Sequence, residues 1–174
     1  KSTTTSMIVK ILRDAGIEAA TYKGPVLAQI VYRNHTLREF RDFDVLVRPD
    51  DFKRAVAILR GRGLRVDNDW TSEWHLAGEI EDEPLIIDLH KQVMDFSLPL
   101  AFGKLAETPN LRVVTVAGHS LSTFSPTTHL LLCCFYLVKE WHNGLPFLQY
   151  LLDVTVLLHD QPEEAWSSFL ARAD

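Results

Sequence analysis

One stretch of the sequence, Arg41-Asp42-Phe43-Asp44-Val45-Leu46-Val47, indicates both a fold class and a kind of site. Its last three residues are apolar and mostly β-branched, as in a buried strand. Side chains two apart on a strand point to one face, so Asp42 and Asp44 can share a metal ion. Burying two aspartates there is costly unless cations neutralise them. The stretch therefore predicts a phosphoryl-transfer site, although such acid pairs also occur on solvated strand edges and at helix starts.

A second feature lies upstream, where Thr21-Tyr22-Lys23-Gly24-Pro25 precedes apolar residues at helical spacing. The pattern predicts a short strand, a glycine turn and a helix with proline at its first position. Such a turn can bind phosphate, because the free amides of the first helical turn point outward and Gly24 lets a ligand approach the backbone. Lys23 would add a positive charge, and as a turn lysine it is expected to face solvent.

A third feature lies downstream, where Ile86-Ile87-Asp88-Leu89-His90 is an apolar strand with one acid. Residues 74–80 and 85–90 look like a hairpin about Glu81-Asp82-Glu83-Pro84, which would bring Asp88 into the sheet that holds Asp42. His90 lies on the strand face of Asp88. It could bind substrate, orient a carboxylate through a hydrogen bond, or be a core histidine with its hydrogen bonds satisfied.

Together these motifs resemble the uncharacterised bacterial nucleotidyltransferase family of the DNA polymerase beta superfamily, over about residues 20–160. The resemblance rests on a Lys-Gly pair, a helix, an arginine, an Asp-hydrophobic-Asp triplet before Leu-Val, and the later Asp-Leu-His strand. It implies that Asp42, Asp44 and Asp88 are catalytic and hold two Mg²⁺ ions, with Mn²⁺ as the alternative. It also implies that Lys23 and Gly24 bind the triphosphate, with Arg38 assisting.

The activity implied by the resemblance is transfer of a nucleoside monophosphate from a nucleoside triphosphate, ATP being favoured, to an acceptor hydroxyl with release of pyrophosphate. A small-molecule acceptor is favoured. One alternative is a protein acceptor, as in antitoxin-type members of the superfamily that adenylylate a partner toxin. The other is a non-catalytic nucleotide-binding or interaction module, which the presence of all three acids disfavours. The metal motif does not indicate which acceptor is used, because the shape of the pocket determines which acceptor binds.

The predicted fold class is α+β, with a mixed sheet flanked by helices over residues 1–120 and a helical subdomain over 121–174. The subdomain is expected because the apolar period becomes helical from Ser125-Pro126 onward. That pattern is still helical where the sequence stops, so we expect the subdomain to be truncated here. Four polar residues are candidates to point inward within it: Lys139, Glu140, His142 and Asp153.

The other elements are read from periodicity and caps. A helix is expected over residues 6–15, with Thr5 or Ser6 as its cap and Gly16 after its end. Strands are expected over 17–22, 64–69 and 111–116, and a helix is expected to begin at Pro49-Asp50-Asp51.

Net charge and the positions of the basic residues limit the classes of ligand that the protein is expected to bind. A net charge of −5 argues against a generic nucleic-acid binder, whose affinity depends on many basic residues on one face. Four arginines nevertheless crowd the acidic pair, which suits a nucleoside triphosphate: Arg33, Arg38, Arg41 and Arg48. Exposed salt bridges with Glu39 and Asp50 are the alternative, favoured for Arg33 and Arg48.

The cysteines and the apolar runs bear on location. Cys133 and Cys134 are adjacent within an apolar helical stretch, so we expect core residues and not a disulfide or a metal pair. Residues 130–138 form the longest apolar run, far below the ~20 residues that span a bilayer, and no leader is recognised at the start. A cytoplasmic protein without a membrane segment is the expectation.

Overall fold

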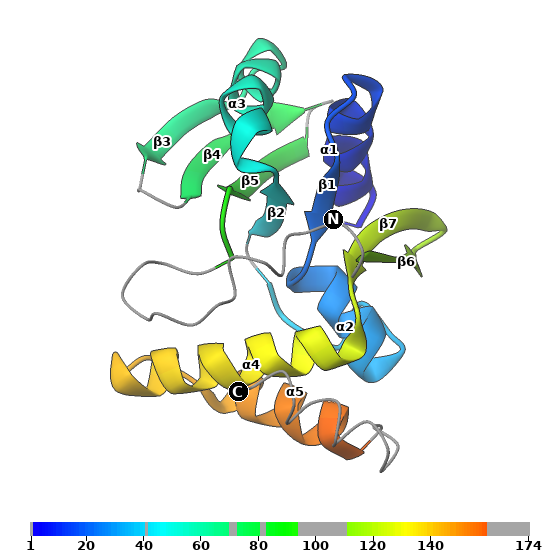
Figure 1. The fold of residues 1–174 in the computed structure, drawn as a ribbon, viewed down its shortest axis with the longest axis vertical. Helices are drawn as coiled ribbons and strands as arrows, with labels where there is room; N and C mark the ends of the chain where they lie inside the picture. Colours follow the sequence, from blue (N-terminus) through cyan, green and yellow to red (C-terminus); the bar gives the residue numbers. More distant parts are fainter. Residues whose placement is uncertain (1, 41, 70–72, 81–82, 94–110, 160–174) are drawn as a thin grey trace.

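The computed structural model describes residues 2–40, 42–69, 73–80, 83–93 and 111–159. A strand-rich body with α1 and α3 lies above a pair of long helices in Figure 1. In chain order the elements are α1 (Ser2–Asp14), β1 (Ala19–Thr21), α2 (Gly24–Tyr32), β2 (Phe43–Val47), the 3-10 helix η1 (Pro49–Asp51), α3 (Phe52–Gly61), β3 (Arg65–Asp69), β4 (Glu73–Ile80), β5 (Glu83–His90), β6 (Leu111–Val116), β7 (His119–Phe124), α4 (Pro126–His142) and α5 (Leu148–His159). The predicted α+β class is confirmed.

The main sheet has the strand order β1-β2-β5-β4-β3. Strands β2 and β5 are parallel, whereas every other neighbouring pair in this sheet is antiparallel. The expected hairpin is confirmed as β4 and β5, and it ends on the pair Ile80 and Glu83. The parallel pair places Asp44 directly beside Asp88.

The two faces of the sheet have different roles, because side chains alternate along each strand. Phe43, Val45 and Val47 point into the main core with residues of α1 and α3. Leu46, from the alternate set, packs instead with residues of α4. Asp44 belongs to this second set, so the carboxylates lie on the face away from α1 and α3.

Strands β6 and β7 form a separate two-stranded sheet, which packs beside β1, α1 and α2. The strand predicted over 111–116 is confirmed, whereas its partner β7 was not predicted. Ala117 and Gly118 both have positive φ values, +48° and +82°. Two consecutive residues of this kind make the turn that suits the twist of a hairpin.

The start of α4 was predicted correctly, whereas the start of α1 was not. Ser125 caps α4 as the change of period at Ser125-Pro126 indicated, and its Oγ accepts a hydrogen bond from the amide of Thr128 at 3.2 Å. The predicted start of the first helix was wrong, because α1 begins at Ser2 and not after Thr5 or Ser6.

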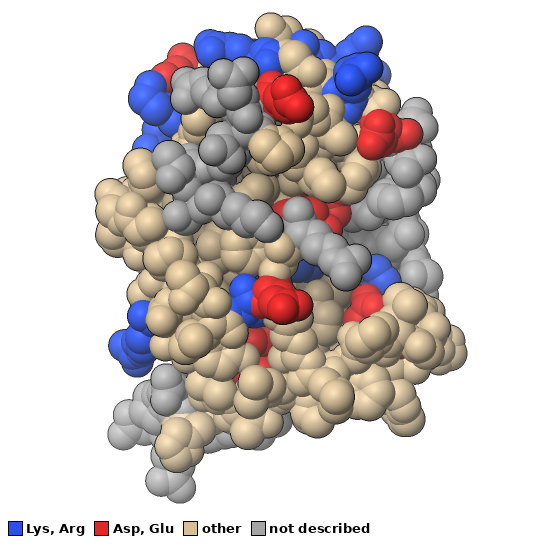
Figure 2. Space-filling view, turned by 180° about the vertical axis from the view of Figure 1, so that it is seen from behind, with Lys and Arg blue, Asp and Glu red and all other residues tan. Residues whose placement is uncertain are grey.

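The helices α4 and α5 pack on α2 through a small apolar cluster that includes Leu27, Leu130 and Val154. Cys133 is buried in this cluster and is a free thiol, as is Cys134, so both behave as core residues. In the described residues, no helix is long and apolar enough to cross a membrane. Figure 2 shows basic side chains gathered at the end that carries α3, while the end formed by α4 and α5 is mostly uncharged.

The division into residues 1–120 and 121–174 remains a prediction. Strand β7 runs from His119 to Phe124 and therefore crosses that boundary. Of the polar residues expected to point inward in the helical part, Asp153 is fully buried, whereas Lys139 and His142 are exposed.

Candidate active site

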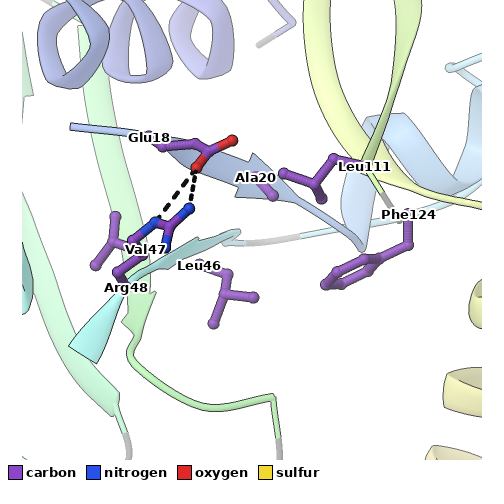
Figure 3. A pocket seen from close by; sticks show the side chains of 7 residues that line it. All are labelled: Glu18, Ala20, Leu46, Val47, Arg48, Leu111 and Phe124. Atoms are coloured by element: carbon purple, nitrogen blue, oxygen red, sulfur yellow. Dashed lines mark hydrogen bonds and ion pairs between the residues drawn. The ribbon is translucent and has the colours of Figure 1, made fainter. Parts of the chain in front are cut away.

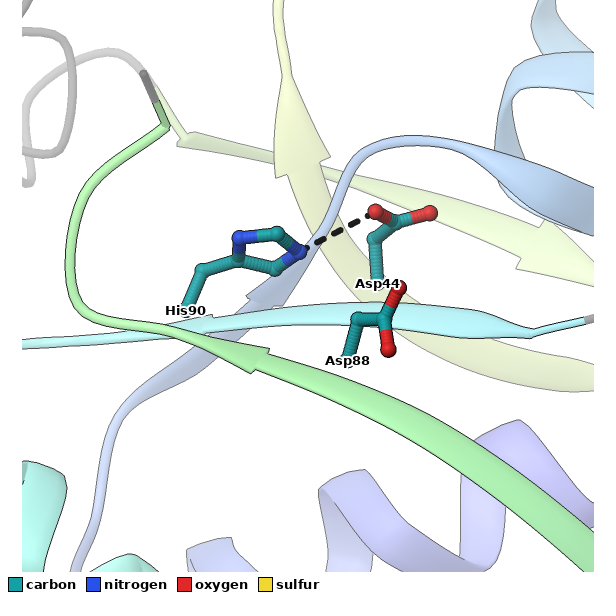
Figure 4. A group of neighbouring side chains, drawn as sticks. All are labelled: Asp44, Asp88 and His90. Carbon is teal, nitrogen blue, oxygen red and sulfur yellow. Dashed lines mark hydrogen bonds and ion pairs between the residues drawn. The ribbon is translucent and has the colours of Figure 1, made fainter. Parts of the chain in front are cut away.

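The centre of the site is a group of three side chains on β2 and β5. Ligand atoms of Asp44, Asp88 and His90 all lie within 4.8 Å of one another. Figure 4 shows the carboxylate of Asp88 directed toward that of Asp44, with the His90 ring on the other side of Asp44. His90 Nε2 lies 3.1 Å from Asp44 Oδ1, and both side chains are almost entirely buried. The adjacency of Asp44 and Asp88 follows from the parallel register.

Asp42 comes just before β2 and is half-buried. It lies outside the 4.8 Å group, which among the described residues consists of Asp44, Asp88 and His90. The charge of Asp42 nevertheless acts on Asp88. Burial raises the pKa of Asp88, and the carboxylates of Asp44 and Asp42 raise it further. The three predicted carboxylates therefore repel one another across one small region.

Lys23 contacts this region directly, contrary to the expectation of a solvent-facing turn lysine. Its Nζ lies 2.6 Å from Asp44 Oδ1, and only 20% of its side chain is exposed. The ammonium also lies 4.3 Å from the centre of the Tyr136 ring. Burial opposes both charges, yet Lys23 and His90 hold the pKa of Asp44 well below its usual range. In turn, Asp44 holds the pKa of Lys23 well above the usual value for a lysine.

Gly24 follows at the start of α2, with a φ of +53° that strongly favours glycine. A β-carbon there would come within 3.6 Å of the Phe40 ring and 3.7 Å of the Asp42 carbonyl oxygen. The glycine turn therefore packs against the segment that leads into Asp42.

His75 is a site residue that the sequence reasoning missed. Its Nδ1 lies 2.5 Å from Asp88 Oδ1, because His75 on β4 pairs with Asp88 on β5. The four-residue turn expected at 81–84 pairs Asp88 with Ala77 instead. In the structure the last paired residues of the hairpin are Ile80 and Glu83, so its turn is two residues shorter than expected, and this register pairs Asp88 with His75. A correct turn length would therefore have identified His75.

Arg38 forms a buried ion pair with Asp153. Its Nε donates to Asp153 Oδ2 at 3.0 Å, with 6% and 0% of the two side chains exposed. Tyr32 donates to the other oxygen of Asp153 at 2.8 Å. The pair joins the segment before β2 to α5, and a direct role of Arg38 in nucleotide binding stays a prediction.

A second ion pair lies on the surface, away from the carboxylates. Figure 3 shows Arg48 bonded to Glu18 beside Leu46 and Phe124, around a hollow of about 20 Å³. Arg48 thus forms an exposed salt bridge, as the alternative interpretation had it, but with Glu18 and not with Asp50. This hollow is about the size of a single water molecule.

Residues 2–174 match a protein family described as uncharacterised nucleotidyltransferases. The chain belongs to this family. The resemblance seen in its motifs is confirmed over nearly the whole length of the sequence. No curated protein sequence matches the chain.

Three solved structures share the fold of this nucleotidyltransferase family member. The solution structure of the antibiotic-resistance factor ANT(2'')-Ia is 15% identical with a TM-score of 0.66, covering 98% of this chain and 91% of that chain. The crystal structure of ANT(2'')-Ia in complex with adenylyl-2''-tobramycin is 15% identical with a TM-score of 0.66, covering 97% and 95%. An antigenic nucleotidyltransferase-like protein from Paracoccidioides brasiliensis is 12% identical with a TM-score of 0.62, covering 97% and 84%. At these identities the likeness is one of fold.

Proposed function

We propose that this chain is a divalent-metal-dependent nucleotidyltransferase that transfers a nucleoside monophosphate from a nucleoside triphosphate, ATP being favoured, to a hydroxyl group of a small molecule. One observation carries the proposal: in a nucleotidyltransferase fold, Asp44 on β2 and Asp88 on β5 lie side by side, with Asp42 just before β2. The acceptor oxygen would form a bond to the α-phosphorus while the bond to the bridging oxygen breaks. Pyrophosphate leaves, and the hydroxyl proton passes to a base.

The donor atoms suit a hard divalent cation. Asp44 and Asp88 offer carboxylate oxygens at one point, which Mg²⁺ and Mn²⁺ prefer. Burial and the neighbouring carboxylates of Asp44 and Asp42 raise the pKa of Asp88, and a cation would stabilise its charged form. We assign Asp42, Asp44 and Asp88 to hold two Mg²⁺ ions, with Mn²⁺ as the alternative. When bound, such ions neutralise the charge that develops on the attacking and leaving oxygens.

The protein's own groups have distinct roles in this proposal. Asp88 accepts the proton of the acceptor hydroxyl, and His75 holds one of its oxygens in place. His90 orients Asp44 by a hydrogen bond and takes no part in bond making.

The nucleotide would lie at the start of α2. Lys23 and the amides after Gly24 bind the β- and γ-phosphates, and Lys23 meanwhile neutralises Asp44. Arg38 is proposed to assist indirectly, because its guanidinium is held by Asp153 and so anchors the segment that carries Asp42.

The test of the function is a turnover assay on the purified chain. Pyrophosphate release is expected only when ATP, Mg²⁺ or Mn²⁺ and a hydroxylated small molecule are all present, with one acceptor gaining the mass of a nucleoside monophosphate. Label transferred to a protein instead would support the antitoxin-type alternative. If the chain binds nucleotide but no acceptor causes ATP to release pyrophosphate, the proposed enzyme activity is contradicted and a nucleotide-binding module remains.

The nucleotide-binding role of Lys23 has its own test. Lys23→Met keeps the length of the side chain but removes its charge, so affinity for a Mg²⁺ complex of a non-hydrolysable ATP analogue should fall by about tenfold, or ~1.4 kcal/mol. Without metal the variant should also lose stability, because Asp44 is left buried without its cation. Calorimetric titration and thermal unfolding measure the two effects.

The matched control is Lys53→Met on α3, since Lys53 is exposed. It should change neither quantity. Unchanged nucleotide affinity in Lys23→Met would assign Lys23 a purely structural role.

A further inference from the structure

A hollow of about 700 Å³ opens beside Asp42, between the segment before β2 and the start of α5. Its lining includes Thr36, Glu39, Phe40, Asp42, Pro146 and Gln149. Pockets for small molecules typically measure about 300–1,000 Å³, so this one can hold a small molecule.

The position of the hollow suits the second substrate of a transfer reaction. Asp42 lines the hollow and comes directly before β2, which carries Asp44, so a hydroxyl of a molecule bound there lies beside the proposed catalytic centre. Phe40 faces the hollow and also approaches Gly24, where the nucleotide turn begins. The phenyl ring thus lies next to both the glycine turn and the hollow.

The charge of the hollow limits what it can bind. Arg38 also borders it, but this guanidinium is already neutralised by Asp153, and no other basic residue is found among the described residues of the lining. Glu39 and Asp42 are both acidic, and Glu39 is exposed. Even if Asp42 is engaged by a cation, Glu39 remains to attract a positive group and repel an anionic one.

The mixture of apolar and hydrogen-bonding residues in the wall of the hollow suits a saccharide-like ligand. Phe40 and Pro146 present apolar surfaces, which suit the flat face of a sugar ring, whereas Thr36 and Gln149 offer hydrogen-bonding groups. Gln149 Nε2 donates to the carbonyl oxygen of Glu39 at 3.0 Å. That hydrogen bond leaves the amide oxygen of Gln149 as an acceptor and ties α5 to the opposite wall.

We infer that this hollow is the acceptor site and that it takes a small polyhydroxylated molecule bearing positive charge, such as an amino sugar; the inference rests on the proposed nucleotide transfer. The cation would lie near Glu39, and the hydroxyl to be modified would lie toward Asp42. Phosphorylated sugars and sugar acids are disfavoured by the same charges.

The test uses two probes that differ mainly in charge: fully deacetylated chitotriose, which is cationic, and its neutral triacetylated form. Each is titrated calorimetrically into the full chain with Mg²⁺ and a non-hydrolysable ATP analogue. The cationic trisaccharide should bind at least about tenfold more tightly, and Glu39→Gln should reduce that preference at least threefold. Glu18→Gln changes an exposed acid directly before β1 that does not line the hollow, and it should leave the preference unchanged.

A second variant tests the location. Thr36→Trp should fill the hollow and weaken both trisaccharides while the separate titration with the ATP analogue stays unchanged. Equal affinity for the two trisaccharides, or a preference unaffected by Glu39→Gln, overturns the inference. Binding of the nucleotide with neither trisaccharide bound overturns the acceptor assignment alone, whereas absence of nucleotide binding contradicts the proposed function itself.

Discussion

Asp88→Asn is expected to lower kcat by about a thousandfold or more, equivalent to ~4 kcal/mol of transition-state stabilisation, while leaving the melting temperature level or slightly raised. An amide can neither accept the acceptor's proton nor neutralise a cation. Stability should not suffer, because burial and the neighbouring carboxylates of Asp44 and Asp42 disfavour the charged form of Asp88, and the amide carries no charge. The oxygen of the new amide can still accept a hydrogen bond from His75. Steady-state kinetics and thermal unfolding without metal measure both quantities.

Asp67→Asn is the matched control, since Asp67 is an exposed acid on β3 of the same sheet. It should leave kcat unchanged. Turnover that survives in Asp88→Asn would remove Asp88 from the mechanism.

Asp44→Asn provides the contrast that separates catalysis from stability. Turnover should again be abolished, but this variant should also unfold more easily without metal. From sequence alone one expects the opposite, because replacing one of three crowded acids relieves repulsion. The contact of 2.6 Å between Lys23 and Asp44 reverses that expectation, since the amide leaves a mostly buried ammonium without its counter-charge.

Asp153→Asn should destabilise the fold by about 3–5 kcal/mol, the largest stability effect we expect from a single substitution here. The loss arises because Arg38 stays buried without a compensating charge, and the amide can no longer accept from both Arg38 and Tyr32 as a carboxylate does. Denaturant unfolding gives the free energy directly. Arg38→Met combined with Asp153→Leu should recover much of the loss, because an apolar pair carries no uncompensated charge.

The exposed pair of Glu18 and Arg48 is the control for this effect. Glu18→Gln should cost less than about 1 kcal/mol, because both side chains are half-exposed and solvent already screens them. Similar losses in the buried and the exposed variants would show that Arg38 and Asp153 do not anchor the segment before β2.

Local patterns were sufficient for most of the elements. The alternation of apolar and acidic residues in 42–47 and 86–90 predicted two strands of one sheet, and the parallel pairing of Asp44 with Asp88 agrees with it. The Gly24-Pro25 step predicted the start of α2. Such features are readable because a strand repeats every two residues and because turns and caps depend on the chemistry of a few neighbours.

The interactions that set charge and position in the site were decided by the tertiary structure. Lys23 meets Asp44 across 21 residues, and Arg38 meets Asp153 across 115. The partner of Asp88 depended on a hairpin that closes two residues earlier than its composition indicated.

By itself, the sequence therefore determined the family, the α+β class and the acids that gather on one sheet face. The tertiary structure alone decided which charges neutralise one another and where a hollow for a second substrate opens. The physical reason is that periodicity and turn chemistry act over a few residues, whereas a buried charge is stabilised by whichever partner the packing of distant segments brings within a few ångströms.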